Sequence, residues 1–124
     1  MVTRSEVEGY DAFCKLIKEL ETQDKTVYVF FSGSKDSTGK SWCPDCVVAV
    51  PVLEKALETA EDIHFVYVGV GDRAYWKDPN CPFRTDKRLR LKCVPTLIKW
   101  GQPDKLEDEE CSKADLVSML FEES

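Results

Sequence analysis

The spacing of apolar residues along the chain alternates between a helical period and continuous runs, and these changes mark the predicted elements. The first helical period covers residues 10–21, where lysine and glutamate lie opposite one apolar face. That face consists of Tyr10, Phe13, Leu16, Ile17 and Leu20. The sequence therefore predicts an amphipathic helix here, and the residues before it are expected to pair as an edge strand.

Two uninterrupted apolar runs predict strands that are covered on both faces. Residues 27–31 and 63–70 are rich in valine, phenylalanine and tyrosine, which is typical of inner strands. Between them, apolar positions keep helical spacing from residue 46 to residue 60, and Pro51 within this helix predicts a kink. A strand, a helix and a second strand in this order predict a right-handed βαβ unit with parallel strands.

The region after the second inner strand is less regular. Residues 71–82 are predicted to form a loop, in which Tyr75 and Trp76 are expected to pack on the domain. Residues 83–91 carry several arginines and lysines and predict a short basic helix with a solvated face.

The last part of the chain predicts two strands and a helix. Residues 94–100 form an apolar strand that Pro95 enters, a position where proline is tolerated. Residues 105–107 predict a short antiparallel edge strand, after which Ser112 is expected to cap a helix. The apolar face of that helix consists of Leu116, Val117, Leu120 and Phe121.

Length and charge narrow the class of protein. At 124 residues, the chain is expected to form one domain, residues 1–124, with a full hydrophobic core. Its 17 basic and 23 acidic residues give a formal net charge of -6, which argues against binding to nucleic acid or anionic membranes. No apolar run is long enough to span a bilayer, and residues 1–9 lack the apolar segment of a signal peptide. We expect a cytoplasmic protein whose cysteines are reduced by default.

The candidate chemistry lies in the sequence Trp-Cys-Pro-Asp-Cys over residues 42–46, between the first inner strand and the following helix. Pro44 fits the first helical position, which makes Cys43 the N-cap and places Cys46 in the first turn, on the buried side. Two cysteines at this spacing can close a disulfide without moving the backbone. We expect an accessible Cys43 to attack a substrate disulfide and a sheltered Cys46 to resolve the product.

Opposing charges surround the leading sulfur. The helix terminus stabilises a Cys43 thiolate by roughly 0.3 to 2 kcal/mol, whereas the Asp45 carboxylate destabilises it by about 1 kcal/mol. Lys40 would offset part of the effect of Asp45. The residues expected to tune this site are therefore Lys40, Trp42, Pro44 and Asp45, and the sequence leaves the net sign of their effect open.

Two other kinds of site compete for the same region. Residues 33–41 nearly match a phosphate-binding loop, but the spacing of the glycines is wrong and Pro44 favours a helix start after the Lys-Ser pair. A Cys-x-x-Cys pair is also half of a zinc site, yet the chain has no second close pair. The remaining candidate metal ligands are His64, Cys81, Cys93 and Cys111, which only the fold can bring together. Two cysteines are interpreted as structural: Cys14, which lies beside the first apolar face, and Cys111. We therefore expect no metal.

Three features together resemble the thioredoxin superfamily: the Trp-Cys-x-x-Cys motif between strand and helix, Pro51 in that helix, and Val-Pro-Thr at residues 94–96. The resemblance implies an α/β fold with a central mixed sheet flanked by helices on both faces. It also implies that Pro95 is cis and faces the dithiol, that Val94 offers backbone groups to an extended substrate, and that Trp42 covers the site beside the attacking sulfur.

The loop after residue 31, the motif at residues 39–46 and residues 75–80 narrow the resemblance to one branch of the superfamily. The buried Asp and Lys of ordinary thioredoxins are expected to be replaced by Val29 and Tyr67. The resemblance implies a cytosolic disulfide reductase with narrow substrates and no bound cofactor, which thioredoxin reductase recharges with electrons from NADPH. It further implies peroxidase activity, small disulfides such as cystine, nitrosothiols, and modulation of NF-kappa-B signalling.

Two further hypotheses concern association with other molecules. Cys93, just before Pro95, is expected near the same surface, where it would form an intermolecular disulfide under oxidation; otherwise we expect a monomer. The alternative to an enzyme is a redox-gated binding module, whose oxidation state selects protein partners without turnover.

Overall fold

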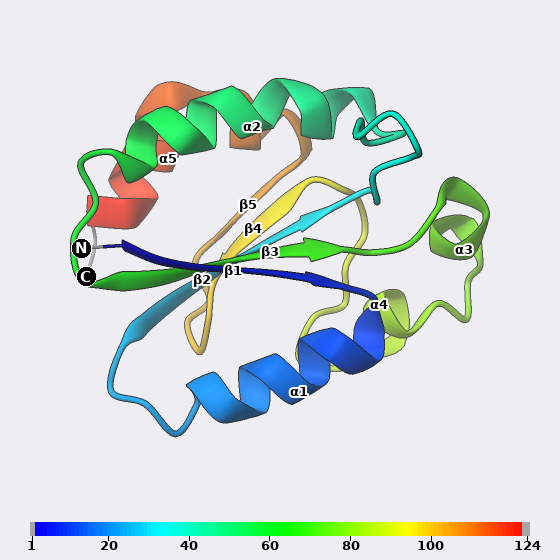
Figure 1. Ribbon diagram of the computed structural model, residues 1–124, viewed down its shortest axis with the longest axis horizontal. Coiled ribbons are helices and arrows are strands. Elements are labelled where there is room, and N and C mark those ends of the chain that lie inside the picture. Colours follow the sequence, from blue (N-terminus) through cyan, green and yellow to red (C-terminus); the bar gives the residue numbers. More distant parts are fainter. Residues whose placement is uncertain (1, 123–124) are drawn as a thin grey trace.

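The computed structural model describes residues 2–122 and contains a five-stranded sheet with helices on both faces (Figure 1). Within these residues, no helix combines the length and apolarity that a bilayer-spanning segment needs. The elements in chain order are β1 (Val2–Glu8), α1 (Tyr10–Leu20), β2 (Thr26–Ser32), α2 (Pro44–Leu57), β3 (Ile63–Gly69), α3 (Arg73–Lys77), α4 (Pro82–Thr85), β4 (Thr96–Lys99), β5 (Lys105–Glu107), the 3-10 helix η1 (Asp108–Ser112) and α5 (Ala114–Glu122).

The sheet is mixed, with strand order β1-β3-β2-β4-β5. Strands β1 and β2 are both parallel to β3, whereas β4 pairs antiparallel with β2 and β5 antiparallel with β4. The predicted βαβ unit, the central position of β2 and the two edge strands are thereby confirmed. Helix α1 covers one face of the sheet, and α2 and α5 cover the other, so the α/β fold class is also confirmed (Figure 1).

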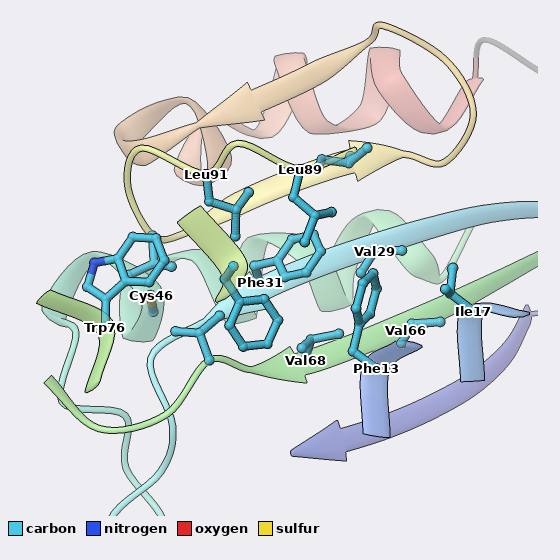
Figure 2. Close-up of a cluster of buried hydrophobic side chains, with 14 of the residues drawn as sticks. Phe13, Ile17, Val29, Phe31, Cys46, Val66, Val68, Trp76, Leu89 and Leu91 are labelled. Atoms are coloured by element: carbon cyan, nitrogen blue, oxygen red, sulfur yellow. The ribbon is translucent and has the colours of Figure 1, made fainter. Parts of the chain in front are cut away.

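Aromatic rings fill the core beneath α1. Phe13 of α1, Phe31 of β2 and Phe83 of α4 pack with ring centroids 5.3 Å (Phe13 to Phe31), 6.2 Å (Phe13 to Phe83) and 6.0 Å (Phe31 to Phe83) apart. Figure 2 shows that Cys46 and Trp76 belong to the same buried cluster, at the end where α2 begins. The core on this face therefore extends to the second cysteine of the motif.

The segment after β3 differs from the prediction of a loop followed by a basic helix. Residues 73–77 form the short helix α3, because the Asp72 side chain accepts the backbone N–H of Tyr75 at 2.8 Å and caps it. The prediction of a basic helix over residues 83–91 is wrong beyond Thr85, where α4 ends. There the Asp86 side chain accepts the backbone N–H of Arg88 at 2.8 Å, which favours a turn over a further helical residue. Trp76 is buried, as predicted, whereas Tyr75, which was also expected to pack on the domain, is exposed.

Two predicted helix boundaries are corrected. Ser112 does not cap the last helix: its hydroxyl donates to the Glu109 carbonyl at 2.8 Å and closes η1, and α5 begins after Lys113. Helix α2 ends at Leu57 rather than near Ala60, because the following residues form bonds of shorter span, such as Ala60 N–H to Leu57 O at 3.3 Å. The helix runs through Pro51, and the kink there stays a prediction.

Asp86 connects the turn after α4 to α1. Its carboxylate accepts Tyr10 Oη at 2.6 Å and Arg88 Nη2 at 2.8 Å. These hydrogen bonds, the one from Arg88 first, lower the pKa of Asp86 from 3.8 to about 2 despite partial burial. The unfolded chain therefore takes up this proton before the folded protein does, and the contribution of Asp86 to stability is lost as the pH falls through this range.

We predict that Asp86→Asn lowers the free energy of unfolding at pH 7 by about 1 to 2 kcal/mol, because two charge-assisted hydrogen bonds are weakened. The variant should also lose less stability than the parent between about pH 4 and pH 2. Urea unfolding at a series of pH values measures both effects. Asp24→Asn, at an exposed position, is the matched control; an equal loss in both variants would contradict the assignment.

Candidate redox site

The loop between β2 and α2 folds back on itself before the cysteine motif. Lys35 and Ser41 form an isolated antiparallel bridge, and the Asp36 carboxylate accepts the backbone N–H of Thr38 at 2.8 Å. Hydrogen bonds from Thr38 lower the pKa of Asp36. Because this loop is a closed turn and the helix begins at Pro44, the Lys-Ser pair does not open a helix as a phosphate-binding loop requires.

The start of α2 places the two cysteines of the motif side by side. Cys43 is the N-cap, with extended backbone, and its Sγ accepts the backbone N–H of Cys46 at 3.2 Å. The two sulfur atoms lie at disulfide distance, with Cα atoms 5.2 Å apart. Cys43 is 5% exposed and Cys46 is 0% exposed. Cys43 is thus the more exposed residue of the two, although less exposed than the sequence led us to expect.

The entrance of β4 lies against the leading sulfur. The Val94-Pro95 peptide bond is cis, as the family resemblance implies. The Val94 carbonyl oxygen lies 3.6 Å from Cys43 Sγ, and the Pro95 carbonyl accepts the backbone N–H of Asp108 at 2.8 Å. Residues about fifty positions apart along the chain therefore form one site.

Trp42 is held against the other side of the motif. Its indole Nε1 donates to the Gly71 carbonyl at 2.8 Å, and the Arg73 guanidinium lies 5.4 Å from the centroid of its ring. The ring packs so closely on Gly33 that a Cβ there would lie 2.7 Å from Trp42 Cε2. The sequence analysis missed Gly33, Gly71 and Arg73. Gly71 adopts a φ of 105°, a left-handed conformation that favours glycine. Of the three missed residues, it is therefore the one that the local sequence could have indicated.

Two carboxylates lie on the side of the site toward Pro95. Asp45, in the first turn of α2, contacts Asp108, the first residue of η1. Partial desolvation, then Asp45 and Glu109, raises the pKa of Asp108. Lys40, which is expected to offset part of the effect of Asp45 on a Cys43 thiolate, is exposed in the preceding loop. Asp108 is a further residue that the sequence analysis missed, because only the fold brings η1 to α2.

Val29 and Tyr67 were both expected to take the places of the buried Asp and Lys of ordinary thioredoxins, but only Val29 lies in the cluster around Cys46. Val29 lies in the apolar cluster that contains Cys46, together with Val66 and Phe31 (Figure 2). Tyr67 lies on the other face of the sheet, where its hydroxyl donates to Ser32 Oγ at 3.0 Å. Successive residues of a strand point to opposite faces, so Val66, and not Tyr67, shares a face with Val29.

The fold does not bring the other candidate metal ligands together in the part of the chain that the structure describes. Among residues 2–122, no group of three or more His, Cys, Asp or Glu side chains is arranged to hold a metal ion. His64 shares a hydrogen bond with Ser5 Oγ at 2.7 Å, and its pKa is lowered, first by burial and then by Lys25.

The other four cysteines are free, and two of them are buried. Cys14 and Cys93 are half-buried, whereas Cys81 and Cys111 are buried. Burial raises the pKa of Cys93 and that of Cys111, the latter to about 12. A thiolate at Cys93, which the hypothesis of an intermolecular disulfide needs, is therefore disfavoured.

Comparison with known proteins agrees with this geometry. A family model described as thioredoxin domain-containing protein 17-like, thioredoxin domain, matches residues 6–123. The chain belongs to this family. This is the branch, also called thioredoxin-related protein of 14 kDa, that the extended loop and the motif resemble, and the resemblance is confirmed.

Two relatives match almost the full length of the chain. It is 50% identical over 126 residues to thioredoxin domain-containing protein 17 of Mus musculus, with 99% of each chain covered. It is 48% identical over 118 residues to the Homo sapiens protein of that name, with 94% of this chain and 93% of the other covered. A crystal structure of Schistosoma mansoni thioredoxin covers 96% of this chain and 95% of its own with a TM-score of 0.57 and 22% identity, which shows the shared fold.

We predict that Gly33→Ala displaces the Trp42 indole, because the added methyl group would overlap the ring. The cost in stability should be about 1 to 3 kcal/mol. In proton-nitrogen correlation spectra, the indole N–H resonance of Trp42 should shift while that of Trp100, bonded to Glu21, should not. Ser37→Ala, at an exposed position of the same loop, is the control. An unmoved Trp42 resonance in Gly33→Ala would show that the contact is not tight.

Proposed function

We propose that this protein is a thiol-disulfide oxidoreductase in which Cys43 is the nucleophile and Cys46 the resolving cysteine. The observation that carries the proposal is the pair of sulfur atoms at disulfide distance at the N-terminus of α2, with the Val94 carbonyl 3.6 Å from Cys43 Sγ. Membership of a thioredoxin family supports the same class of chemistry.

The proposed reaction is a pair of thiol-disulfide exchanges. A Cys43 thiolate attacks one sulfur of the substrate disulfide, a mixed disulfide forms, and the first substrate thiol leaves. Cys46 then loses its proton and attacks Cys43 Sγ, which releases the second thiol. The substrate disulfide gains two electrons and two protons, and Cys43 and Cys46 become a disulfide.

Local structure supports different roles for the two sulfurs. The Cys46 backbone N–H points at Cys43 Sγ, and together with the positive end of α2 it stabilises a negative charge on that atom. Pro44 sets this geometry by starting the helix, while Asp45 opposes the charge and Lys40 reduces that opposition. The apolar cluster around Cys46 disfavours a thiolate there. Cys43 is therefore the group that reacts first.

Substrate would bind along the rim formed by Trp42, Val94 and Pro95. The Val94 carbonyl lies 3.6 Å from Cys43 Sγ, so the backbone at Val94 and Pro95 faces the motif, where its polar groups can pair with an extended substrate strand. Trp42 covers the opposite side through its bond to Gly71. From the family we infer a single-domain, monomeric cytoplasmic protein that binds no cofactor, receives electrons from NADPH through thioredoxin reductase, and also has peroxidase activity and a role in NF-kappa-B signalling.

A redox-gated binding module is the second candidate function. The small exposed fraction of Cys43, 5%, favours it, because a cysteine with so little accessible surface reacts slowly with substrates. In such a module the oxidation state of the pair would change the rim around Val94 and Trp42 and so select a protein partner without turnover.

We predict that Cys46→Ser accumulates a mixed disulfide with substrate, because the first exchange remains possible and the second does not. Cys43→Ser should form none. Nonreducing electrophoresis and intact-mass measurement after incubation with a disulfide substrate detect the adduct. If the adduct forms on Cys46 in Cys43→Ser instead, the two roles are reversed.

We predict continuous NADPH oxidation when the protein is combined with thioredoxin reductase and cystine, and background rates for Cys46→Ser. Cys14→Ser, which changes a cysteine remote from the motif, should leave the rate unchanged and serves as the control. If no small or protein disulfide supports turnover, while capture of a protein partner still depends on the state of the pair, the binding module is the correct function.

A further inference from the structure

The short helix α3 lies beside the redox pair and is fixed there by backbone contacts. Figure 1 places α3 at the same end of the molecule as the N-terminus of α2. The Gly71 carbonyl accepts both the Trp42 indole N–H at 2.8 Å and the Ser34 backbone N–H at 3.1 Å. With Asp72 capping the helix, the first residue of α3, Arg73, is held over the ring of Trp42.

Arg73 is a cation without a carboxylate partner. None of the ion pairs formed within residues 2–122 involves Arg73, and its side chain is exposed. Its guanidinium carbon lies 5.4 Å from the centroid of the Trp42 ring. A guanidinium that lies over a ring still has its N–H groups, at the edge of its plane, available to bind a carboxylate in a bidentate manner.

The charges on the two sides of Cys43 have opposite sign. Asp45 and Asp108 lie toward Pro95, where Asp108 also donates its N–H to the Pro95 carbonyl. Arg73 lies on the opposite side, over Trp42, the residue directly before Cys43. On a protein of net charge -6, Arg73 is a positive charge close to the redox pair that can attract an approaching anion, whereas Asp45 and Asp108 repel it.

We propose that Arg73 is a specificity-determining residue that binds a carboxylate of the substrate while the substrate's disulfide lies at Cys43. The substrate class is disulfides, small or peptidic, that carry a carboxylate a few bonds from the reacting sulfur. This inference rests on the proposed oxidoreductase function, because it concerns the substrate of the same sulfur pair.

The test uses three small disulfides of similar length that differ in charge: dithiodipropionate with two carboxylates, neutral dithiodiethanol, and cystamine with two ammonium groups. Fully reduced protein is mixed with each disulfide, and the second-order rate of thiol release is measured without any reductase. In Arg73→Gln, the ratio of the dithiodipropionate rate to the cystamine rate should fall about three- to fivefold, as expected for one exposed ion pair. Charge reversal in Arg73→Glu should lower the ratio further, and added salt should reduce the difference between the variants.

Lys77→Gln is the matched control, because it removes one positive charge at the other end of the same helix. Its rate ratio should equal that of the parent. A role of Arg73 in positioning Trp42 alone would change all three rates by the same factor and leave the ratio fixed, which would overturn the proposal. An equal change of ratio in Lys77→Gln would also overturn it, since net charge would then be the cause. If the parent protein reacts with none of the three disulfides, the oxidoreductase function itself fails.

Discussion

The hydrogen bond from the Cys46 backbone N–H to Cys43 Sγ fixes the relation between the two sulfurs, and the rest of the site is arranged around it. It exists because Pro44 cannot donate an N–H and disfavours helical backbone at the residue before it, which makes Cys43 the N-cap. One sulfur then lies at the helix end and the other on its buried face. The difference in environment between the two cysteines follows from where one helix begins.

The order of the strands supplies the opposite wall of the site. Strand β2 leads into the cysteine motif, and β4 pairs with it antiparallel, with Phe31 opposite Thr96. The end of β2 and the entrance of β4 therefore lie at the same edge of the sheet, which brings Val94 and Pro95 to Cys43. The backbone N–H of Asp108 then holds the Pro95 carbonyl from η1. A local motif and a distant proline become neighbours through strand pairing alone.

The loop between β2 and α2 connects the motif to α3. Its turn around Asp36 returns the chain to Ser41, and Trp42 then reaches across to Gly71. This contact gives the site two unlike sides, with an aromatic ring and Arg73 on one and two carboxylates on the other. The motif itself supplies Trp42 and Asp45, whereas Arg73 and Asp108, which complete the asymmetry in charge, come from other elements.

The sequence by itself determined the features that depend on local pattern: α1, the two inner strands, β5, the start of α2 and the inequivalence of Cys43 and Cys46. Each of these follows from residue spacing or from the backbone limits of proline, which act over a few residues. Only the tertiary structure decided that α3 exists, that α4 ends at Thr85, that Tyr67 faces away from Val29, and that Arg73 and Asp108 border the site. These depend on single side-chain bonds, such as those of Asp72 and Asp86, and on contacts between elements far apart in the chain. Such contacts leave no periodic signal in the sequence.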